Sequence, residues 1–442
     1  MVKQEQLQAI DHKHIWHPFS QHLDYEDMPP ILIKKAKGIK LFSDESWFYD
    51  SISSWWCNIH GHGHPTLQQA LNDQFESIDH TIFSGFSHEP AIKLTEKLMA
   101  ITPKNLTRVF FSDNGSTAIE IALKQSLQYW TLTGKPTKKK LCFFEGGYHG
   151  DTIGAMSVSG TKHFHQHFAS LCFDAHCLPN PSTVYDAEAE TRSLTALETL
   201  FNENHKEIAA ILIEPLMMGA GGMLNNSPIF LQKLAGLCKH YNVHLICDEI
   251  AVGFGRTGDL FVSEALHLEP DFLCLSKAIT NGCMPLAVTL CTESIFDAFS
   301  GPYETHTFFH GHTFTGNPLA CALANASLDV FDQEQSLEHI NTLIPQLHQQ
   351  FYALCTKHKL FYPRVCGTIM ACDLSDIKNP NATLPKRLGK VLYQIGLKHN
   401  LILRPLGNTV YLYLPLCISK EDTHDIFIKL ELALDCFKTD YL

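Results

Sequence analysis

The sequence of 442 residues lacks the features that would place it at or across a membrane. It contains no apolar run near the roughly 20 residues that a membrane-spanning helix needs. Its first ten residues, MVKQEQLQAI, mix charged and polar side chains where a secretory signal would have an apolar segment. We therefore expect a protein that works in the cytoplasm without membrane association.

Positive charge is also scarce. Lys and Arg number 34 against 46 Asp and Glu, so the formal net charge is −12. Such an acidic chain offers no electrostatic footprint for nucleic acid and no attraction to an anionic membrane surface. We therefore expect small-molecule substrates as binding partners.

Patterns typical of disulfide frameworks and metal sites are missing as well. The 15 cysteines form no CxxC pair and lie mostly in apolar segments, which favours reduced packing thiols in a cytosolic protein. Two histidine tracts, His60-Gly-His-Gly-His64 and His163-Phe-His-Gln-His167, have no Cys or carboxylate partners arranged around them. We expect these to be surface or helix-capping histidines, and no metal site.

The common nucleotide-binding motifs are absent or out of context. There is no GxxxxGK[ST], which excludes a P-loop kinase. Gly253-Phe-Gly-Arg-Thr-Gly258 has the spacing GxGxxG, but Asp248-Glu249 and a loop separate it from the preceding apolar run. Because no clear helix follows it either, we do not expect a dinucleotide site.

What the sequence does contain is a long alternation of strand and helix patterns. Helices are expected from Pro65, from Glu89 to Met99, over 117–129 and over 228–241. Strands separated by helices predict an α/β fold with a mostly parallel, doubly wound sheet. The apolar runs that we expect to be its strands are 108–112, 141–144, 208–213, 243–247, 272–276 and 286–290.

The two ends of the chain have a different pattern. Beyond about residue 330, long amphipathic helices over 335–358, 384–399 and 420–437 alternate with short strands at 366–374, 401–404 and 409–414. Short strands are also expected at 31–33 and 39–42. We therefore predict an N-terminal arm with part of a small domain (1–63), a large domain (64–330) and a small α+β domain (331–442).

Two of the apolar runs end in residues with matching chemistry. The run 243–247 leads into Asp248, and the run 272–276 leads into Lys277. If the runs are neighbouring parallel strands, both residues lie at the sheet edge where such folds bind ligands. A desolvated lysine forms a Schiff base with an aldehyde, and a carboxylate keeps a pyridine nitrogen protonated, which is what pyridoxal chemistry needs. The alternative is a helix-capping Asp248 and a solvated Lys277.

Several loops suit a phosphate or a flat ring. Ser112-Asp-Asn-Gly-Ser116 precedes a helix, where backbone N–H groups stabilise phosphate, although an ordinary helix cap has the same pattern. The glycines of Gly146-Gly-Tyr148-His-Gly-Asp151 allow close approach of a ring on which Tyr148 or His149 could stack. Glu214 is either a supporting carboxylate or a turn residue. His310-Gly-His-Thr313 precedes a helix that begins near Asn317.

Aromatic side chains and one arginine remain as candidates for substrate contact. The clusters Ile15-Trp-His-Pro-Phe19 and Ser53-Ser-Trp55-Trp56 could line an apolar pocket or serve as packing. Arg404 ends a short apolar strand. Its guanidinium suits recognition of a carboxylate, and a strand-end ion pair is the alternative.

Together these segments resemble the class III aminotransferases, which are fold-type I pyridoxal-phosphate enzymes. The resemblance runs from about residue 12 to the end of the chain. The spacing from Asp248-Glu-Ile to Lys277 is typical of the class, and Trp16-His-Pro with Trp55-Trp56 is typical of a branch that works in biotin synthesis. The segments that carry it are His14-Ile-Trp-His-Pro18, Ser53-Ser-Trp-Trp56, Ile59-His-Gly61, Tyr148-His-Gly-Asp-Thr152, Gly219-Ala-Gly-Gly-Met223, Cys247-Asp-Glu-Ile-Ala-Val-Gly-Phe-Gly-Arg-Thr-Gly258 and Gly316-Asn-Pro-Leu-Ala-Cys-Ala322.

The resemblance implies a large domain with a mostly parallel seven-stranded sheet, a smaller α+β domain, and pyridoxal 5′-phosphate as cofactor. It also implies roles for individual residues. The catalytic residues would be Lys277, Asp248 and Tyr148, and the residues that contact the cofactor would be Gly115, Ser116, Tyr148, Asp248, Lys277, His312 and Thr313. Those that contact the substrate would be Phe19, Trp55, Trp56, Tyr148, Gly311 and Arg404. Since Thr313 would be lent by the other subunit, with Gly311 and His312 beside it, the resemblance implies a homodimer with shared active sites.

For the biotin branch the implied acceptor is 8-amino-7-oxononanoate and the implied donor is S-adenosylmethionine, with lysine as second candidate. Two departures bear on the donor, because the family often has Tyr at Phe19 and usually has Pro at His312. Another class III enzyme, such as an ornithine or γ-aminobutyrate aminotransferase, would be expected to have a short polar pocket in place of the tryptophan pair. A catalytically silent cofactor-binding protein would not be expected to keep Asp248, Lys277 and Thr313 together.

Overall fold

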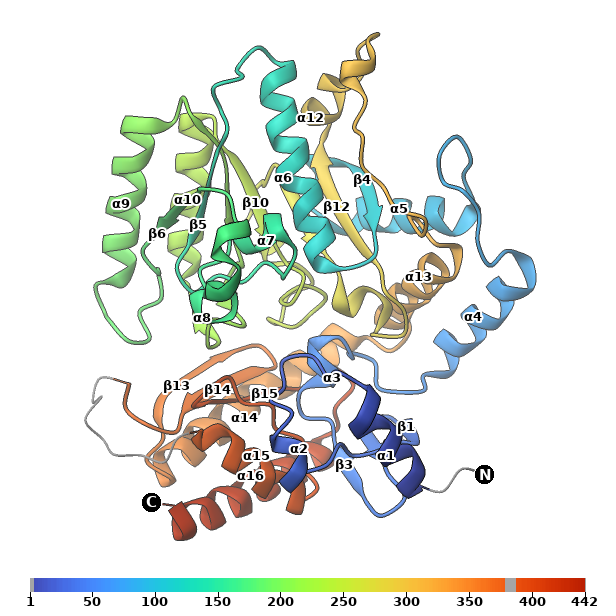
Figure 1. Ribbon diagram of the computed structural model, residues 1–442, viewed down its shortest axis with the longest axis vertical. Coiled ribbons are helices and arrows are strands. Elements are labelled where there is room, and N and C mark those ends of the chain that lie inside the picture. The colour runs from blue at the N-terminus through green and yellow to red at the C-terminus, as the bar shows by residue number, and fades with distance from the viewer. Residues whose placement is uncertain (1–3, 378–386, 442) are drawn as a thin grey trace.

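The computed structural model describes residues 4–377 and 387–441 of the chain. Its upper part in Figure 1 is built around a seven-stranded sheet with the strand order β4-β12-β11-β10-β7-β5-β6. Only β12 runs antiparallel to its neighbours, so the predicted mostly parallel α/β sheet is confirmed. The strands are β4 (Leu106–Ser112), β5 (Lys140–Phe144), β6 (His176–Leu178), β7 (Ile208–Ile213), β10 (His244–Asp248), β11 (Phe272–Leu275) and β12 (Ala287–Thr292).

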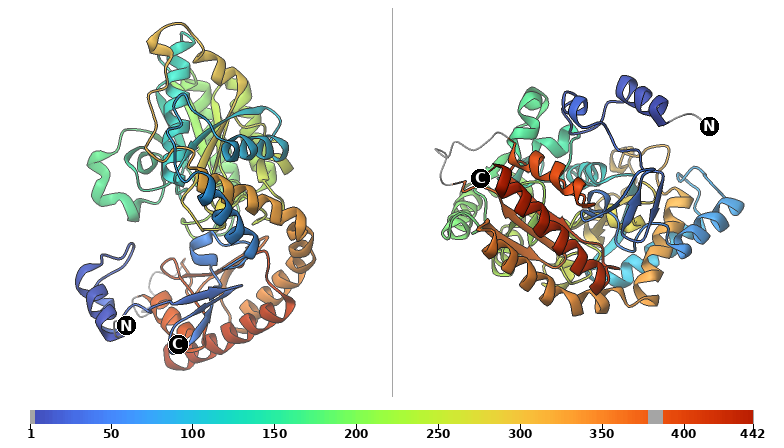
Figure 2. Two further views of the ribbon diagram at one scale, coloured as in Figure 1. Left: turned by 90° about the vertical axis from the view of Figure 1, so that its right-hand side faces the viewer. Right: turned by 90° about the horizontal axis from the view of Figure 1, so that it is seen from below.

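Helices cover both faces of this sheet, as Figures 1 and 2 show. The apolar residues of α6 (Gly115–Leu132), α7 (Ile153–Ser157) and α12 (Glu293–Ala298) pack on one face. Those of α5 (Glu89–Ile101), α9 (Ala189–Asn204), α10 (Pro228–Tyr241) and α13 (Pro318–Gln333) pack on the other. The central strands β7 and β10 are buried along their whole length, as the continuous apolar runs predicted.

The lower part of Figure 1 contains a second, antiparallel sheet. Its strands are β13 (Phe361–Cys366), β14 (Ile369–Asp373) and β15 (Thr409–Tyr413), and its helices are α14 (Ser336–Lys357), α15 (Leu388–Lys398) and α16 (Lys420–Tyr441). The strand predicted over 366–374 corresponds to β14 but begins too early, because Gly367, with a positive φ of 55°, turns the chain between β13 and β14. The first residues of the helix predicted over 384–399 lie outside the described residues.

The N-terminal residues form a small sheet of their own beside this second part. It consists of β1 (Lys35–Lys37), β2 (Lys40–Phe42) and β3 (Trp47–Tyr49), preceded by the helices α1 (Gln4–His14) and α2 (Asp24–Asp27). The strand predicted at 31–33 was wrong, since pairing starts at Lys35. The strand predicted at 401–404 was also wrong, because only Leu401 pairs, in an isolated bridge with Tyr49.

The remaining elements are short or connect these parts. Among the described residues, no helix combines the length and the apolar character needed to cross a membrane. The connecting elements are α3 (Ser53–Trp56), α4 (Pro65–Ser77), α8 (Lys162–His165), α11 (Val262–Ala265), the 3-10 turns η1 (Gln166–Leu171), η2 (Lys277–Thr280) and η3 (Glu304–His306), and the two-residue strands β8 (Met217–Met218) and β9 (Leu224–Asn225).

Candidate active site

A cavity of about 1570 Å³ opens at the carboxyl ends of the central strands. Asp248 is the last residue of β10, and Lys277 follows its parallel neighbour β11 by two residues. The expectation that these two residues meet at one sheet edge is therefore confirmed. Of the residues singled out from the sequence, the cavity is lined by Phe19, Trp55, Trp56, Gly115, Ser116, Tyr148, Asp248, Lys277 and Arg404.

Asp248 is buried and held by two neighbours. Its Oδ1 accepts a hydrogen bond from the Ile250 N–H at 3.1 Å, and its Oδ2 lies 2.7 Å from His149 Nδ1. Burial lowers the pKa of His149, but the hydrogen bond with Asp248 and the charges of Asp248 and Glu214 together outweigh burial and leave that pKa above its ordinary value. The sequence offered ring stacking as one role for His149, and the structure instead uses it to fix Asp248.

Lys277 begins the turn η2 with a positive φ of 48°, an unusual backbone conformation for a residue with a side chain. Its Nζ lies 5.1 Å from the ring centroid of Trp56. In the described part of the chain no carboxylate pairs with it. Burial lowers the pKa of Lys277, so the amine is more readily neutral than a solvated lysine.

The start of α6 lines the cavity beside these two residues. Asn114 caps the helix, because its Oδ1 accepts from the Thr117 N–H at 3.0 Å while its own N–H donates to Thr117 Oγ1. The N–H groups of Gly115 and Ser116 have no acceptor among the described residues. A side chain at Gly150 would place Cβ 1.9 Å from Ser116 Oγ, so glycine is needed there.

Tyr148 is positioned by a buried carboxylate. Glu214 Oε2 accepts from the Tyr148 N–H at 2.9 Å, and its Oε1 accepts from the Gly219 N–H at 3.1 Å. Burial raises the pKa of Glu214 to about 7. The Tyr148 hydroxyl donates to Asp151 Oδ2 at 2.8 Å. Glu214, whose role the sequence left open, thus supports the loop that carries Tyr148.

The tryptophan pair sits in a left-handed turn. Residues Ser53 to Trp56 have φ values of 51°, 45°, 70° and 74°, a strained run for residues other than glycine. Asp50 stabilises it, since its Oδ1 accepts from the Ser54 N–H at 2.8 Å and its Oδ2 from Ser54 Oγ at 2.6 Å. This conformation was not predicted, because neither Ser nor Trp favours a positive φ and the residue types therefore give no signal for it.

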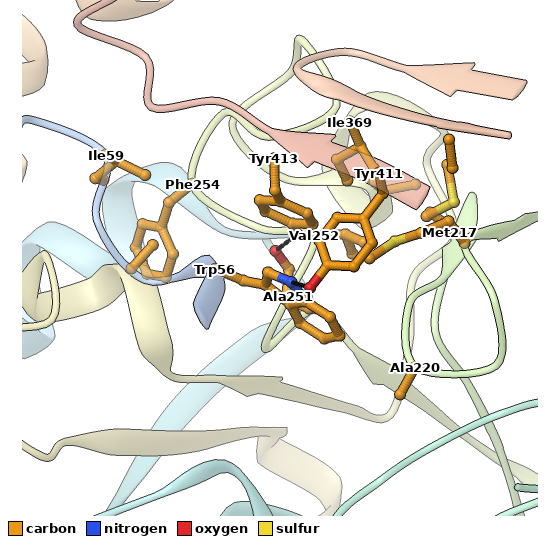
Figure 3. Close-up of a cluster of buried hydrophobic side chains, with 14 of the residues drawn as sticks. Trp56, Ile59, Met217, Ala220, Ala251, Val252, Phe254, Ile369, Tyr411 and Tyr413 are labelled. Carbon is orange, nitrogen blue, oxygen red and sulfur yellow. Dashed lines mark hydrogen bonds between the residues drawn. The ribbon is translucent and has the colours of Figure 1, made fainter. Parts of the chain in front are cut away.

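Trp56 is buried beneath the cavity. Figure 3 shows it against two tyrosines of β15, with its Nε1 donating to the Tyr411 hydroxyl at 3.2 Å. Its ring stacks on Tyr413 with centroids 5.4 Å apart, and the Tyr413 hydroxyl donates to the Ala251 carbonyl at 2.5 Å. The second sheet thereby supports a wall of the cavity.

Trp55 faces the cavity as part of an aromatic wall. Its ring lies 5.6 Å from that of Phe19, which in turn lies 5.7 Å from that of Phe164. The Arg404 guanidinium lies 5.7 Å from the Trp55 ring and donates to the Phe19 carbonyl at 3.0 Å. An apolar surface therefore ends at a cation. Phe164 was missed by the sequence reasoning, which weighed its tract only as a metal site.

Gly311, His312 and Thr313 do not line this cavity. They lie in a loop where Gly311 and Thr313 are exposed and His312 is partly buried, with His312 Nε2 3.9 Å from Asp113 Oδ1. Asp113 does line the cavity. The loop is followed by α13, which Asn317 caps as predicted. A contribution of this loop to the site of a second subunit stays a prediction.

The histidine tracts have structural partners. His64 caps α4 and lies 2.9 Å from Glu334 Oε1. The expectation of surface or capping positions was wrong for His60 and His165, which are buried beside Ser327 and Asp151 respectively. Among the residues that the structure describes, no cluster of three potential metal ligands occurs.

Comparisons with known proteins identify the family to which this chain belongs. Residues 22–434 match the model of the family "Aminotransferase class-III". A curated relative from Synechococcus elongatus, an adenosylmethionine-8-amino-7-oxononanoate aminotransferase, is 41% identical over 96% of this chain and 99% of its own. Among the Geobacter sulfurreducens proteins, one of the same name is 38% identical over 94% of each chain.

Comparison with solved structures leads to the same family. The crystal structure of the enzyme of that name from Methanocaldococcus jannaschii superimposes with a TM-score of 0.93 at 34% identity, over 98% of this chain and 99% of that one. An amine transaminase from an uncultivated Pseudomonas species, in its PLP-bound form, gives 0.89 at 28% identity, over 96% and 98% of the two chains. The protein belongs to the class III aminotransferases, which are pyridoxal 5′-phosphate-dependent enzymes.

Proposed function

We propose that this aminotransferase converts 8-amino-7-oxononanoate to 7,8-diaminononanoate in biotin synthesis, with S-adenosylmethionine as amino donor. The names and near full-length match of its relatives support this reaction. The observation within the site that carries it is the aromatic wall of Trp55, Phe19 and Phe164 that ends at Arg404. An apolar wall with a terminal guanidinium suits an acyl chain that ends in a carboxylate.

The cofactor fits the residues at the sheet edge. Lys277 is a partly buried amine with no carboxylate partner in the described chain, and the N–H groups of Gly115 and Ser116 are free to bind a dianionic phosphate. Asp248 is held in place by His149 for a basic ring nitrogen. Pyridoxal phosphate, when bound, supplies an aldehyde for attachment and an electron-withdrawing ring.

We assign roles to these residues as part of the proposal. Lys277 Nζ would be the point of attachment and would take up the proton that the substrate carbon releases, which its lowered pKa favours. Asp248, held in place by His149, would keep the ring nitrogen protonated. Tyr148 would lie over the ring, Trp55 and Trp56 would exclude water beside the acyl chain, and Arg404 would receive the carboxylate.

We also propose a homodimer in which Gly311, His312 and Thr313 of one subunit complete the phosphate site of the other. Support comes from exposed apolar side chains near this loop: Phe309 is 69% and Phe314 59% exposed. Phe314 contacts His80, whose segment exposes Ile82 and Phe86 as well. Such a patch favours a protein interface. The free cysteines support a cytoplasmic location.

Single-turnover spectra test the reaction and its donor. Wild-type protein is mixed with S-adenosylmethionine or with lysine, and loss of the visible absorbance of the bound cofactor is followed, then its return on adding 8-amino-7-oxononanoate. We expect conversion with S-adenosylmethionine, and none in Lys277→Ala. Conversion by lysine alone would show that lysine is the donor. Phe19 gives a specific reason to test this, because it lacks the hydroxyl of the tyrosine that the family often has at this position. Turnover retained in Lys277→Ala would overturn the assignment.

A further inference from the structure

His165, the last residue of the short helix α8, makes one polar contact. Its Nε2 lies 3.0 Å from Asp151 Oδ1, while its buried Nδ1 has no hydrogen-bond partner among the described residues. An unpartnered buried nitrogen costs stability. The imidazole is therefore placed for its contact with Asp151 rather than for a network that stabilises the fold.

Asp151 has a second partner on its other oxygen. Its Oδ2 accepts the hydrogen bond from the Tyr148 hydroxyl at 2.8 Å. Its side chain is 48% exposed, so packing alone does not fix its rotamer. Its backbone N–H donates to Ser116 Oγ at 3.1 Å, which ties the residue to the start of α6 but leaves the carboxylate free to rotate.

His165 also contacts Tyr148 directly. The two rings stack with centroids 5.9 Å apart and an interplanar angle of 23°, and Phe164 packs edge-on against Tyr148 from the same helix. The imidazole thus touches both members of the Tyr148–Asp151 pair. It orients the carboxylate at one oxygen and limits the tilt of the tyrosine ring.

We propose that His165 is a positioning residue for transamination: it holds Asp151 so that the Tyr148 hydroxyl keeps one direction at the cavity wall. His165 does not line the cavity and acts through Asp151. The inference rests on the proposed function in one respect, namely that Tyr148 lies against the reacting groups. It adds a residue to that site whose effect requires both Asp151 and Tyr148.

A double-mutant cycle tests the proposal in the holoenzyme. His165→Phe keeps the ring and removes the donor nitrogen, whereas His165→Gln places an amide N–H near the position of Nε2. We expect His165→Phe to slow the donor half reaction about tenfold, in line with coupling between contacting residues, and His165→Gln to restore most of the rate. In a Tyr148→Phe or Asp151→Ala background, His165→Phe should cost less than about twofold.

A second readout does not depend on activity. With 3-fluorotyrosine at position 148, we expect one sharp fluorine resonance in wild type and in His165→Gln, and a broadened or doubled one in His165→Phe. The matched control is His167→Phe, because His167 is an exposed histidine of the same segment that contacts neither Asp151 nor Tyr148. It should leave both the rate and the resonance unchanged.

The outcomes separate the two levels of inference. Equal loss from His165→Phe in the wild-type and Tyr148→Phe backgrounds, or an unchanged fluorine resonance, would overturn the role of His165. If His165→Phe does not fold, the same comparison is made with His165→Leu and Asp151→Ala, where a rate of the double variant clearly below that of Asp151→Ala alone would overturn it. Absence of donor conversion by the wild type would instead refute the proposed function.

Discussion

At the scale of single residues, the site joins side chains whose polarity conflicts with their burial. Asp248, His149, Glu214 and Lys277 lie together at one sheet edge, and the pKa or the orientation of each is set by burial or by a neighbour. Asp248 and Lys277 could be located from the sequence because each directly follows an apolar run that was expected to be a strand. It did not pair His149 with Asp248, since that contact spans 99 residues and leaves no periodic pattern.

Glu249, next to Asp248, gives a pH prediction. It is fully buried, and its two oxygens accept from the N–H groups of Val262 and Ser263 at 2.7 Å each. Burial raises its pKa from 4.5 to about 7. A carboxyl group with a raised folded-state pKa stabilises the fold below its unfolded pKa and loses that contribution as pH rises through the folded value.

Between pH 4.5 and about 7, wild type should therefore lose about 3 kcal/mol of unfolding free energy relative to Glu249→Gln. Thermal unfolding midpoints measured in steps from low to neutral pH would show the wild-type curve falling toward the variant. Glu264→Gln serves as control, because Glu264 is a partly exposed residue of α11, the helix whose N–H groups bind Glu249. Its curve of unfolding midpoint against pH should run parallel to that of wild type. Parallel curves for Glu249→Gln as well would contradict the prediction.

At the scale of elements, the long buried strands and capped helices were predictable, whereas the short strands were predicted only in part. The helix α10 occupies the predicted range 228–241, with Ser227 as cap and Pro228 as first residue. The strands predicted at 31–33 and 401–404 failed because two or three apolar residues pair only where a neighbouring strand is available. The left-handed turn of Ser53–Trp56 could not be read from its residue types.

Asp50 should control that turn. Asp50→Ala removes the acceptor of the Ser54 N–H and hydroxyl and the partner of His62 Nε2, 2.8 Å from Oδ2. We expect the free energy of unfolding to fall by about 3 kcal/mol, because three hydrogen bonds to the buried Asp50 carboxylate are lost and the left-handed residues can relax. Near-ultraviolet circular dichroism should report loss of the fixed tryptophan environment, together with a lower unfolding midpoint.

The control for this variant is Asp44→Ala, which removes an exposed carboxylate that pairs with Lys34 in the same N-terminal segment. Surface ion pairs of this kind contribute little, so the midpoint and the tryptophan signal should stay near wild type. An Asp50→Ala protein with an unchanged tryptophan signal would show that the turn does not depend on Asp50.

At the scale of the whole molecule, the cavity lies between the large sheet and residues of the second sheet, and its wall draws on both. The division into residues 1–63, 64–330 and 331–442 stays a prediction. Contacts of Tyr49 with Asn400 and Ile402 support the grouping of the N-terminal strands with the small domain. The sequence could not locate the apolar patch around Phe309 and Phe314, since exposure depends on the tertiary fold.

The proposed dimer gives the prediction at this scale. Phe309→Asp combined with Phe314→Asp places two carboxylates in the exposed patch, so we expect a monomer by sedimentation and at least a tenfold weaker cofactor affinity, since a partner loop is lost. Ile428→Asp and Leu432→Asp on α16, at 42% and 46% exposure, form the matched control. A double variant that stays dimeric would show that the dimer interface does not include Phe309 and Phe314.

The left-handed turn of Ser53–Trp56 can form all its contacts only after the C-terminal strand β15 has been synthesised. Ser53 Oγ donates to the Tyr413 carbonyl at 2.6 Å across 360 residues of chain, and the Tyr413 N–H donates to the Ser51 carbonyl. At ribosomal rates, synthesis of that span takes on the order of 20 to 70 s. The nascent chain therefore carries the Ser53–Trp56 turn without its partner strand until β15 has been synthesised. By then the strands that bear Asp248 and Lys277 have long been made.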